Sequence, residues 1–188
     1  MESSHTTAPD KGDRQRVILS TVWFTVPGTF VLLAIGYWAM PPLAQMEGAA
    51  PRLILAVRWL VVALLPYAAV CLWIAFARLL EGAHNPLLGS ESESLKIHCR
   101  VMQNTLEQLV WFAVCLLALS TYLSGEQARI IPVLCTFFAL ARFVYWWGYL
   151  RAVTLGRAPG VQLTLSLNVA LLVAVCIQLE RHLWSDAG

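Results

Sequence analysis

Five long apolar segments alternate with short polar ones along this chain of 188 residues. Each apolar segment reaches the roughly 20 residues that an α-helix needs to cross the hydrocarbon core of a bilayer. The pattern therefore predicts an all-α integral membrane protein. The expected transmembrane helices lie at about residues 17–39, 53–80, 97–124, 128–153 and 161–180.

The connections between these segments contain residues that end helices. Proline lacks a backbone N–H and glycine favours turns, so both mark helix boundaries. Residues 1–16 are polar, and we expect them to form a disordered cytoplasmic tail. The boundary residues are Pro41 and Pro42 after the first segment, Asn85 and Pro86 after the second, Gly125 after the third and Pro159 after the fourth.

The serine and glutamate run from Ser90 to Ser94 directly precedes the third expected helix. Serine is a favoured N-cap residue, and carboxylates near a helix N-terminus interact favourably with the helix dipole. We interpret the run as the cap of this helix. Phosphorylation or cation binding is the alternative interpretation.

Composition places the chain among membrane proteins. Hydrophobic residues make up 59% of it and charged residues only 13%, whereas soluble domains carry about 25% charged residues. The net charge of +2 and the lack of a basic patch give no indication of nucleic-acid binding. The five cysteines are odd in number and mostly lie within apolar segments, which argues against a disulfide framework or a zinc site.

The positions of lysine and arginine in the short connections predict the orientation in the membrane. Cytoplasmic loops are enriched in these residues. With the N-terminus inside, the cytoplasmic side would hold Lys11, Arg14, Arg16, Arg78, Lys96, Arg100, Arg151 and Arg157, and the opposite side only Arg52, Arg129 and Arg181. We therefore expect a cytoplasmic N-terminus and a C-terminus on the opposite side.

Polar residues inside the third apolar segment form a stripe on one face of the expected helix. Arg100, Asn104 and Glu107 lie within about 60° of one another at about 100° per residue. Ionisable residues in a membrane span are costly to bury, and they usually pair with one another or mark a functional site.

A second stripe, in the fourth segment, consists of Arg142, Tyr145 and Tyr149, and Arg151 follows it. Glu107 and Arg142 would both lie roughly 15–17 Å below the cytoplasmic ends of their helices. Equal depth and opposite charge predict a buried ion pair between Glu107 and Arg142.

The two stripes can be interpreted in two ways. Buried arginine, asparagine and glutamate side chains can hold helices together by hydrogen bonds. Packing needs only one pair, however, whereas this set also contains cations near the membrane surface. Guanidinium groups beside amide and hydroxyl groups suit carboxylates and a developing thiolate, so we favour a ligand site.

At these residues the sequence resembles the MAPEG superfamily, the membrane-associated proteins in eicosanoid and glutathione metabolism. The resemblance covers about residues 53–182 and rests on the motifs Ala83-His-Asn-Pro-Leu87, Arg100-Val-Met-Gln-Asn-Thr-Leu-Glu107, Ala141-Arg-Phe-Val-Tyr-Trp-Trp-Gly-Tyr-Leu-Arg151 and Arg157-Ala-Pro159. The first apolar segment and the run Asn85-Pro-Leu-Leu-Gly-Ser-Glu-Ser92 are similar to the mattrin-like branch of this superfamily.

The resemblance implies a four-helix transmembrane bundle at residues 53–182, preceded by one extra transmembrane helix at 17–39. It also implies a homotrimer that binds glutathione between subunits near the cytoplasmic face. The glutathione-binding residues would be Arg100, Asn104, Glu107, Arg142, Tyr145 and Tyr149.

Catalytic residues follow from the same resemblance. The arginine that activates the thiol in some members matches Arg151 or Arg157, and Tyr149 would donate a hydrogen bond beside it. Gln103 stands where some prostaglandin synthases have arginine, and Gln108 stands where the leukotriene synthase type has tyrosine. These two departures argue against eicosanoid chemistry and leave glutathione binding in place.

Together these observations predict a membrane-embedded glutathione transferase or peroxidase in a bacterial inner membrane or a eukaryotic endomembrane, with its site facing the cytoplasm. A guanidinium would lower the thiol pKa of glutathione from about 8.5. The thiolate would then attack a lipophilic electrophile or a lipid hydroperoxide. The alternative is a non-catalytic protein that binds a lipid or a protein partner; a transporter is disfavoured because no internal repeat is visible.

Overall fold

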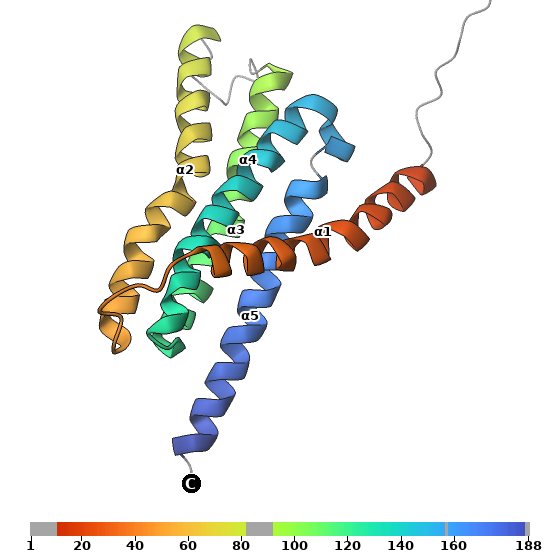
Figure 1. The fold of residues 1–188 in the computed structure, drawn as a ribbon. Coiled ribbons are helices and arrows are strands. Elements are labelled where there is room, and N and C mark those ends of the chain that lie inside the picture. The colour runs from red at the N-terminus through yellow and green to blue at the C-terminus, as the bar shows by residue number, and fades with distance from the viewer. Residues whose placement is uncertain (1–10, 82–91, 157, 187–188) are drawn as a thin grey trace, which may run out of the picture.

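The computed structural model describes residues 11–81, 92–156 and 158–186, which form five long α-helices and one 3₁₀ turn (Figure 1). The elements are α1 (Lys11–Ala39), α2 (Ala49–Glu81), α3 (Glu93–Tyr122), η2 (Glu126–Arg129), α4 (Ile130–Gly156) and α5 (Ala158–Asp186). Each long helix contains a stretch that is long and apolar enough to span a membrane. The prediction of an all-α protein with five transmembrane helices is confirmed.

The helices are longer than the apolar segments that predicted them. Helix α2 begins at Ala49 and α3 at Glu93, before the apolar runs that start near residues 53 and 97. Helix α1 begins at Lys11, earlier than the apolar run that starts near residue 17; residues 1–10 lie outside the described residues. Once a helix is nucleated, each added residue gains a backbone hydrogen bond, so a helix extends past the end of its apolar face.

Helices α2 to α5 run alternately up and down in Figure 1, and α1 crosses them. The start of α3 and the junction of α4 with α5 lie at one end of the bundle, here called the upper end from its place in the figure. The end of α3 and the turn η2 lie at the opposite, lower end. Helix α1 packs against α5 and α4 and covers one side of the bundle formed by the other four.

Two clusters of buried side chains fill the interior. The larger cluster joins α2, α3, α4 and α5 around the stacked rings of Phe112 and Phe138, whose centroids are 4.5 Å apart. The smaller cluster contains Val70, Ile74, Leu95, Val101, Tyr145 and Tyr149. The tyrosine stripe predicted in the fourth segment is therefore part of the packed core.

Large hydrophobic side chains also cover the outside. Trp23, Phe24, Trp38, Leu72 and Trp184 are each at least 72% exposed. Soluble monomers rarely expose contiguous apolar surface on this scale. The outer face of the bundle is thus suited to contact with lipid or with another subunit.

Arg52, a buried residue of α2, links the connection between α1 and α2 to the end of α3 at the lower end of the bundle. Its guanidinium donates to the main-chain oxygens of Met46, Ser120 and Thr121 at 3.0, 3.2 and 3.3 Å. Ser120 and Thr121 lie in the last turn of α3, where carbonyl groups lack helical partners and attract cations. Arg52 therefore fixes the connection between α1 and α2 to the end of α3.

Candidate functional site

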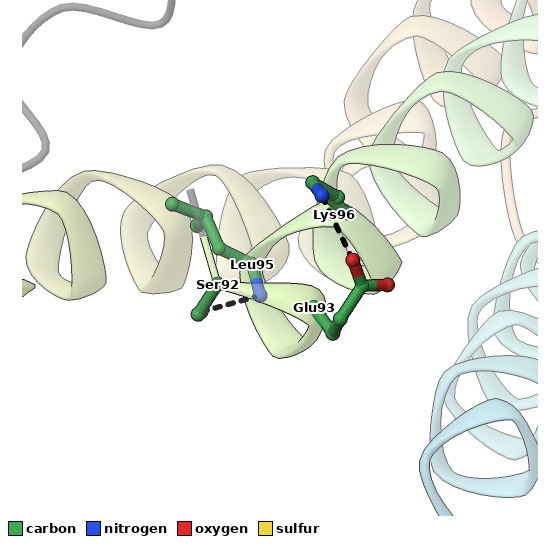
Figure 2. A network of polar contacts seen from close by, with 4 residues as sticks. All are labelled: Ser92, Glu93, Leu95 and Lys96. Atoms are coloured by element: carbon green, nitrogen blue, oxygen red, sulfur yellow. Dashed lines mark hydrogen bonds and ion pairs between the residues drawn. The ribbon is translucent and has the colours of Figure 1, made fainter. Parts of the chain in front are cut away.

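The start of α3 is fixed by a side-chain cap (Figure 2). The hydroxyl oxygen of Ser92 accepts a hydrogen bond from the backbone N–H of Leu95 at 3.2 Å, and Glu93 pairs with Lys96 at 2.8 Å. The interpretation of this run as a helix cap is confirmed for Ser92 and Glu93, whereas Ser90 and Glu91 lie outside the described residues. The cap sets where α3 begins.

Arg142 is the centre of the polar cluster between α3 and α4. Only 1% of its side chain is exposed. Its Nη2 donates to the hydroxyl of Thr105 at 2.8 Å and to Oδ1 of Asn104 at 3.0 Å, and its Nε donates to the same hydroxyl at 3.3 Å. Its Cζ lies 4.0 Å from the ring centroid of Tyr145, a cation–π contact. One donor of this guanidinium, Nη1, is buried and has no acceptor within the described chain.

Glu107 does not pair with Arg142, and this expectation from the sequence is wrong. The carboxylate of Glu107 is exposed and accepts a hydrogen bond from Nε2 of Gln103 at 3.2 Å. Within the described residues, Arg142 instead bonds to neutral oxygen atoms of Asn104 and Thr105. The reason is rotational: Thr105 and Glu107 are two residues apart and therefore project about 160° from one another around α3.

The hydrogen bond from Arg142 holds the side-chain amide of Asn104 in one orientation. Because its Oδ1 accepts from Arg142, its amide NH₂ is directed away from the guanidinium. Asn104 is half-buried, and Arg100, one turn nearer the upper end, is exposed. The stripe therefore presents one amide donor and one solvated guanidinium next to the buried cation of Arg142.

Tyr145 and Tyr149 lie beside this cluster on α4. Each is only 2% exposed, and their rings meet edge to face with centroids 5.8 Å apart. The backbone of Tyr145 touches α5 at Gly160, where an added Cβ would overlap with the backbone and side chain of Tyr145. This close approach fixes the position of Tyr145, and with it the ring that lies under Arg142.

The structure does not bring Arg151 into the cluster. Its guanidinium lies 3.9 Å from the ring centroid of Trp147, on the exposed side of α4. Arg151 follows Tyr149 by two residues and so projects about 160° away from it around the helix. Arg157, the other candidate for activating a thiol, lies outside the described residues.

Three polar contacts were missed in the sequence. Thr105, instead of Glu107, accepts the hydrogen bond of Arg142. Its position between Val101 and Leu109 on the buried face of α3 could have predicted this. Asn168, fully buried in α5, donates through Nδ2 to the main-chain and side-chain oxygens of Gln108 at 3.1 and 2.9 Å. An asparagine inside an apolar segment could have been flagged on the same grounds as Glu107.

The third missed contact joins α3 to α4 near the upper end. The indole Nε1–H of Trp146 donates to Nδ1 of His98 at 3.0 Å, and the ring of Trp73 from α2 lies 5.7 Å from the imidazole. A nitrogen that accepts a hydrogen bond carries no proton, so the proton of a neutral imidazole is on Nε2. This contact holds α3 and α4 together above the Arg142 cluster.

Comparison with known proteins gives one match. A model of the MAPEG family matches residues 56–177, which include every described site residue named above and exclude α1. No curated protein and no solved structure was found to match the chain.

Proposed function

Since the chain belongs to the MAPEG family, we propose that it binds glutathione and either transfers it to lipophilic electrophiles or uses it to reduce lipid hydroperoxides. Membership makes it a multi-pass membrane protein of the superfamily that serves glutathione and eicosanoid metabolism, and members of this family generally use glutathione. The reaction and the residues that carry it are the proposed part.

The observation that carries the proposal is the hydrogen bond from Arg142 to Asn104. It places a buried positive charge beside a half-buried amide whose donors point away from the guanidinium. A buried cation without an acidic partner is costly, and in this cluster it has only neutral acceptors. An anionic ligand would supply the missing negative charge.

Glutathione has two carboxylates and one ammonium group, and the polar residues match this distribution. Arg100 would bind one carboxylate in a charge-assisted contact. The amide of Asn104 would donate to the same ligand, and Arg142 would contribute through its electric field and through Nη1. Glu107, which is exposed, would accept from the ammonium group.

The surroundings of Glu107 support a trimer with the site at its interface. Glu107 shares one exposed stripe of α3 with Val110 and Val114, which are 56% and 64% exposed. A lone carboxylate on an apolar face in contact with hydrocarbon would be costly. Packing of a second subunit against this stripe would remove Glu107 from lipid and close the site around the ligand.

The chemistry would proceed from the thiolate of glutathione. A guanidinium beside the sulfur would favour the thiolate over the thiol. Arg157, which lies outside the described residues, is the candidate left by the position of Arg151. With an electrophile, sulfur forms a bond to carbon and the leaving group departs with its electron pair. With a hydroperoxide, sulfur attacks the terminal oxygen, an alcohol leaves, and a second glutathione converts the sulfenic acid into a disulfide and water.

A non-catalytic role is the second candidate, and Gln108 favours it. The side chain of Gln108 is held by Asn168 inside the bundle, on a position where the leukotriene synthase type has tyrosine. A protein with this arrangement would bind a lipid or a protein partner at the same site without turnover. Membership of the mattrin-like branch, which the sequence suggests, would be compatible with either of the two roles.

Calorimetry with glutathione on the detergent-purified protein tests the proposal. We expect binding, conjugation of 1-chloro-2,4-dinitrobenzene or reduction of cumene hydroperoxide, and a roughly ten- to hundredfold weaker affinity in Arg100→Ala. Arg58→Ala is the matched control, because Arg58 is exposed on α2 and takes no part in the site. Absence of binding would overturn the proposal, and binding without turnover would favour the non-catalytic role.

A further inference from the structure

Arg129, the last residue of η2, carries a positive charge at the lower end of the bundle next to the end of α1. Its Cζ lies 4.1 Å from the ring centroid of Tyr37 and 5.6 Å from that of Trp38, and its Nη1 donates weakly to the main-chain oxygen of Met40 at 3.4 Å. Its Nε is buried without an acceptor in the described chain. Arg129 is therefore held by aromatic faces and by a carbonyl.

Carboxylates nearby do not neutralise this charge. Glu126 precedes Arg129 by one turn and is exposed, and the carboxylate of Glu47 lies near Gly125. Among the described residues, neither forms an ion pair with Arg129. An external anion could therefore approach the guanidinium.

An apolar groove of about 340 Å³ lies between α1 and α4. Leu32 and Gly36 of α1, with Met40 directly after the helix, form one wall; Trp59 of α2 contributes to the lining, and α4 lines the groove from Pro132 to Leu140. At about 1.5 Å per residue, that stretch of α4 is about 12 Å long. Met40 links the two features, because it lines the groove and accepts the hydrogen bond of Arg129.

Helix α1 approaches α4 closely at Gly36. A Cβ added to Gly36 would lie 2.7 Å from Cγ1 of Val133. The groove has one wall from α1, which lies outside the matched family segment 56–177. It is thus a feature of this chain's additional helix and is separate from the cluster around Arg142.

We propose that this groove binds one acyl chain of an anionic phospholipid whose phosphate pairs with Arg129. Two candidate spans form the groove, Leu19–Ala39 and Glu126–Arg151. The first ends and the second begins at the lower end of the bundle, which places Arg129 near the membrane interface. Tyrosine and tryptophan are typical of that depth, and arginine pairs well with phosphate. The apolar walls beyond them match an acyl chain.

Charge distinguishes this groove from another one beside α1. A larger groove of about 610 Å³ lies between α1 and α5 and is lined by Val26, Phe30 and α5 residues from Leu165 to Ile177. Ser166 is the single polar residue of that lining, and no ionisable side chain contributes to it. Of these two grooves, the one between α1 and α4 has a cation hydrogen-bonded to one of its lining residues, Met40, so we expect that groove to select lipids by headgroup charge.

Native mass spectrometry with two added lipids tests this site. The probes are dioleoyl phosphatidylglycerol and dioleoyl phosphatidylcholine, which have the same acyl chains and differ in net charge. We expect wild-type protein to retain the anionic lipid about fivefold more strongly, as for one arginine near a charged membrane surface. Arg129→Gln should abolish this preference, and Arg129→Lys should keep most of it.

Two further variants complete the experiment. Arg181→Gln removes an exposed arginine of α5 and should leave the lipid preference unchanged. Thr136→Trp fills the groove from its α4 wall and should lower the retention of both lipids. Equal retention of the two lipids by the wild type, an unchanged preference in Arg129→Gln, or unchanged retention in Thr136→Trp would each overturn the proposal.

Discussion

The guanidinium of Arg142 on α4 donates to Oδ1 of Asn104 on α3 across 3.0 Å, and so directs the amide NH₂ of Asn104 away from the guanidinium. This makes Arg142 a positioning residue for Asn104 as well as a source of positive charge. The same guanidinium holds Thr105 at 2.8 Å and lies over the ring of Tyr145. One side chain thus links the two stripes found in the sequence.

Arg142→Met should separate ligand binding from folding. Methionine fills a similar volume without a buried charge, and replacing buried charges by apolar groups is often neutral or stabilising. We expect thermal unfolding in detergent at or above the wild-type temperature, together with a roughly ten- to hundredfold rise in the Kd for glutathione. Arg58→Met is the control, and an unchanged Kd in Arg142→Met would remove Arg142 from the site.

Glu107→Gln should leave the single subunit stable, because the carboxylate contacts only the exposed side chain of Gln103. If the stripe with Val110 and Val114 lies in a subunit interface, the variant should form less trimer and bind glutathione more weakly. Native mass spectrometry gives the oligomeric state, and thermal unfolding gives the stability. A large loss of stability with no change in oligomer would instead indicate a buried partner for Glu107.

Gly160→Ala should disturb the contact between α5 and α4, because the new Cβ would overlap with the backbone of Tyr145. Overpacking of this kind typically costs about 1–3 kcal/mol. Gly28→Ala is a matched control: Gly28 is helical and has open space around it, so the substitution should be neutral or stabilising by roughly 0.5–1 kcal/mol. Equal melting temperatures of the two variants would contradict the close packing at Gly160.

Gln162→Leu should loosen α1 from the bundle. The Gln162 side chain accepts from Thr25 at 2.6 Å and donates to Thr21 at 2.9 Å, which joins α5 to α1. Each such contact in a membrane is worth roughly 0.6 kcal/mol. Hydrogen–deuterium exchange should show faster exchange in α1, whereas Ser166→Ala, which removes a bond within α5 only, should not change it.

Cysteine labelling should place the two ends of the bundle on opposite sides of the membrane. Single cysteines at Ser92 and Ser185, in a protein without its native cysteines, report on the start of α3 and the end of α5. We expect Ser92→Cys to react from the cytoplasm and Ser185→Cys from the other side, because lysine and arginine are concentrated on the first. Reaction of both from one side would contradict the five-span topology.

The sequence was sufficient for features that depend on local pattern. An apolar run of about 20 residues predicts a span directly, and the five spans follow from this rule alone. Ser92 was identified as part of a cap because N-capping depends on a few neighbouring residues. Helical periodicity also placed Arg142 and Tyr145 on one face of α4, where their side chains are in contact.

Features that depend on the rotation of one helix against another could not be predicted. Depth along the membrane was used to pair Glu107 with Arg142, but depth is unchanged when a helix turns about its axis. Thr105 faces α4 because the apolar residues around it, such as Val101 and Leu109, determine which side of α3 is buried. The attachment of α1 was equally hidden, because Thr25 and Gln162 are 137 residues apart.

That separation has a consequence for the order of biosynthesis. At about 5–20 residues per second, Gln162 emerges from the ribosome roughly 7–27 s after Thr25. Helix α1 is therefore synthesised several seconds before Gln162, its hydrogen-bonding partner on α5. Its threonines can tolerate the delay, because their hydroxyls have main-chain acceptors within α1. Thr25 can donate its single proton to the oxygen of Thr21 at 2.8 Å instead of to Gln162, and Thr29 donates to the oxygen of Thr25 at 2.9 Å. The first helix to be made can thus remain a separate span and be the last to join the assembled bundle.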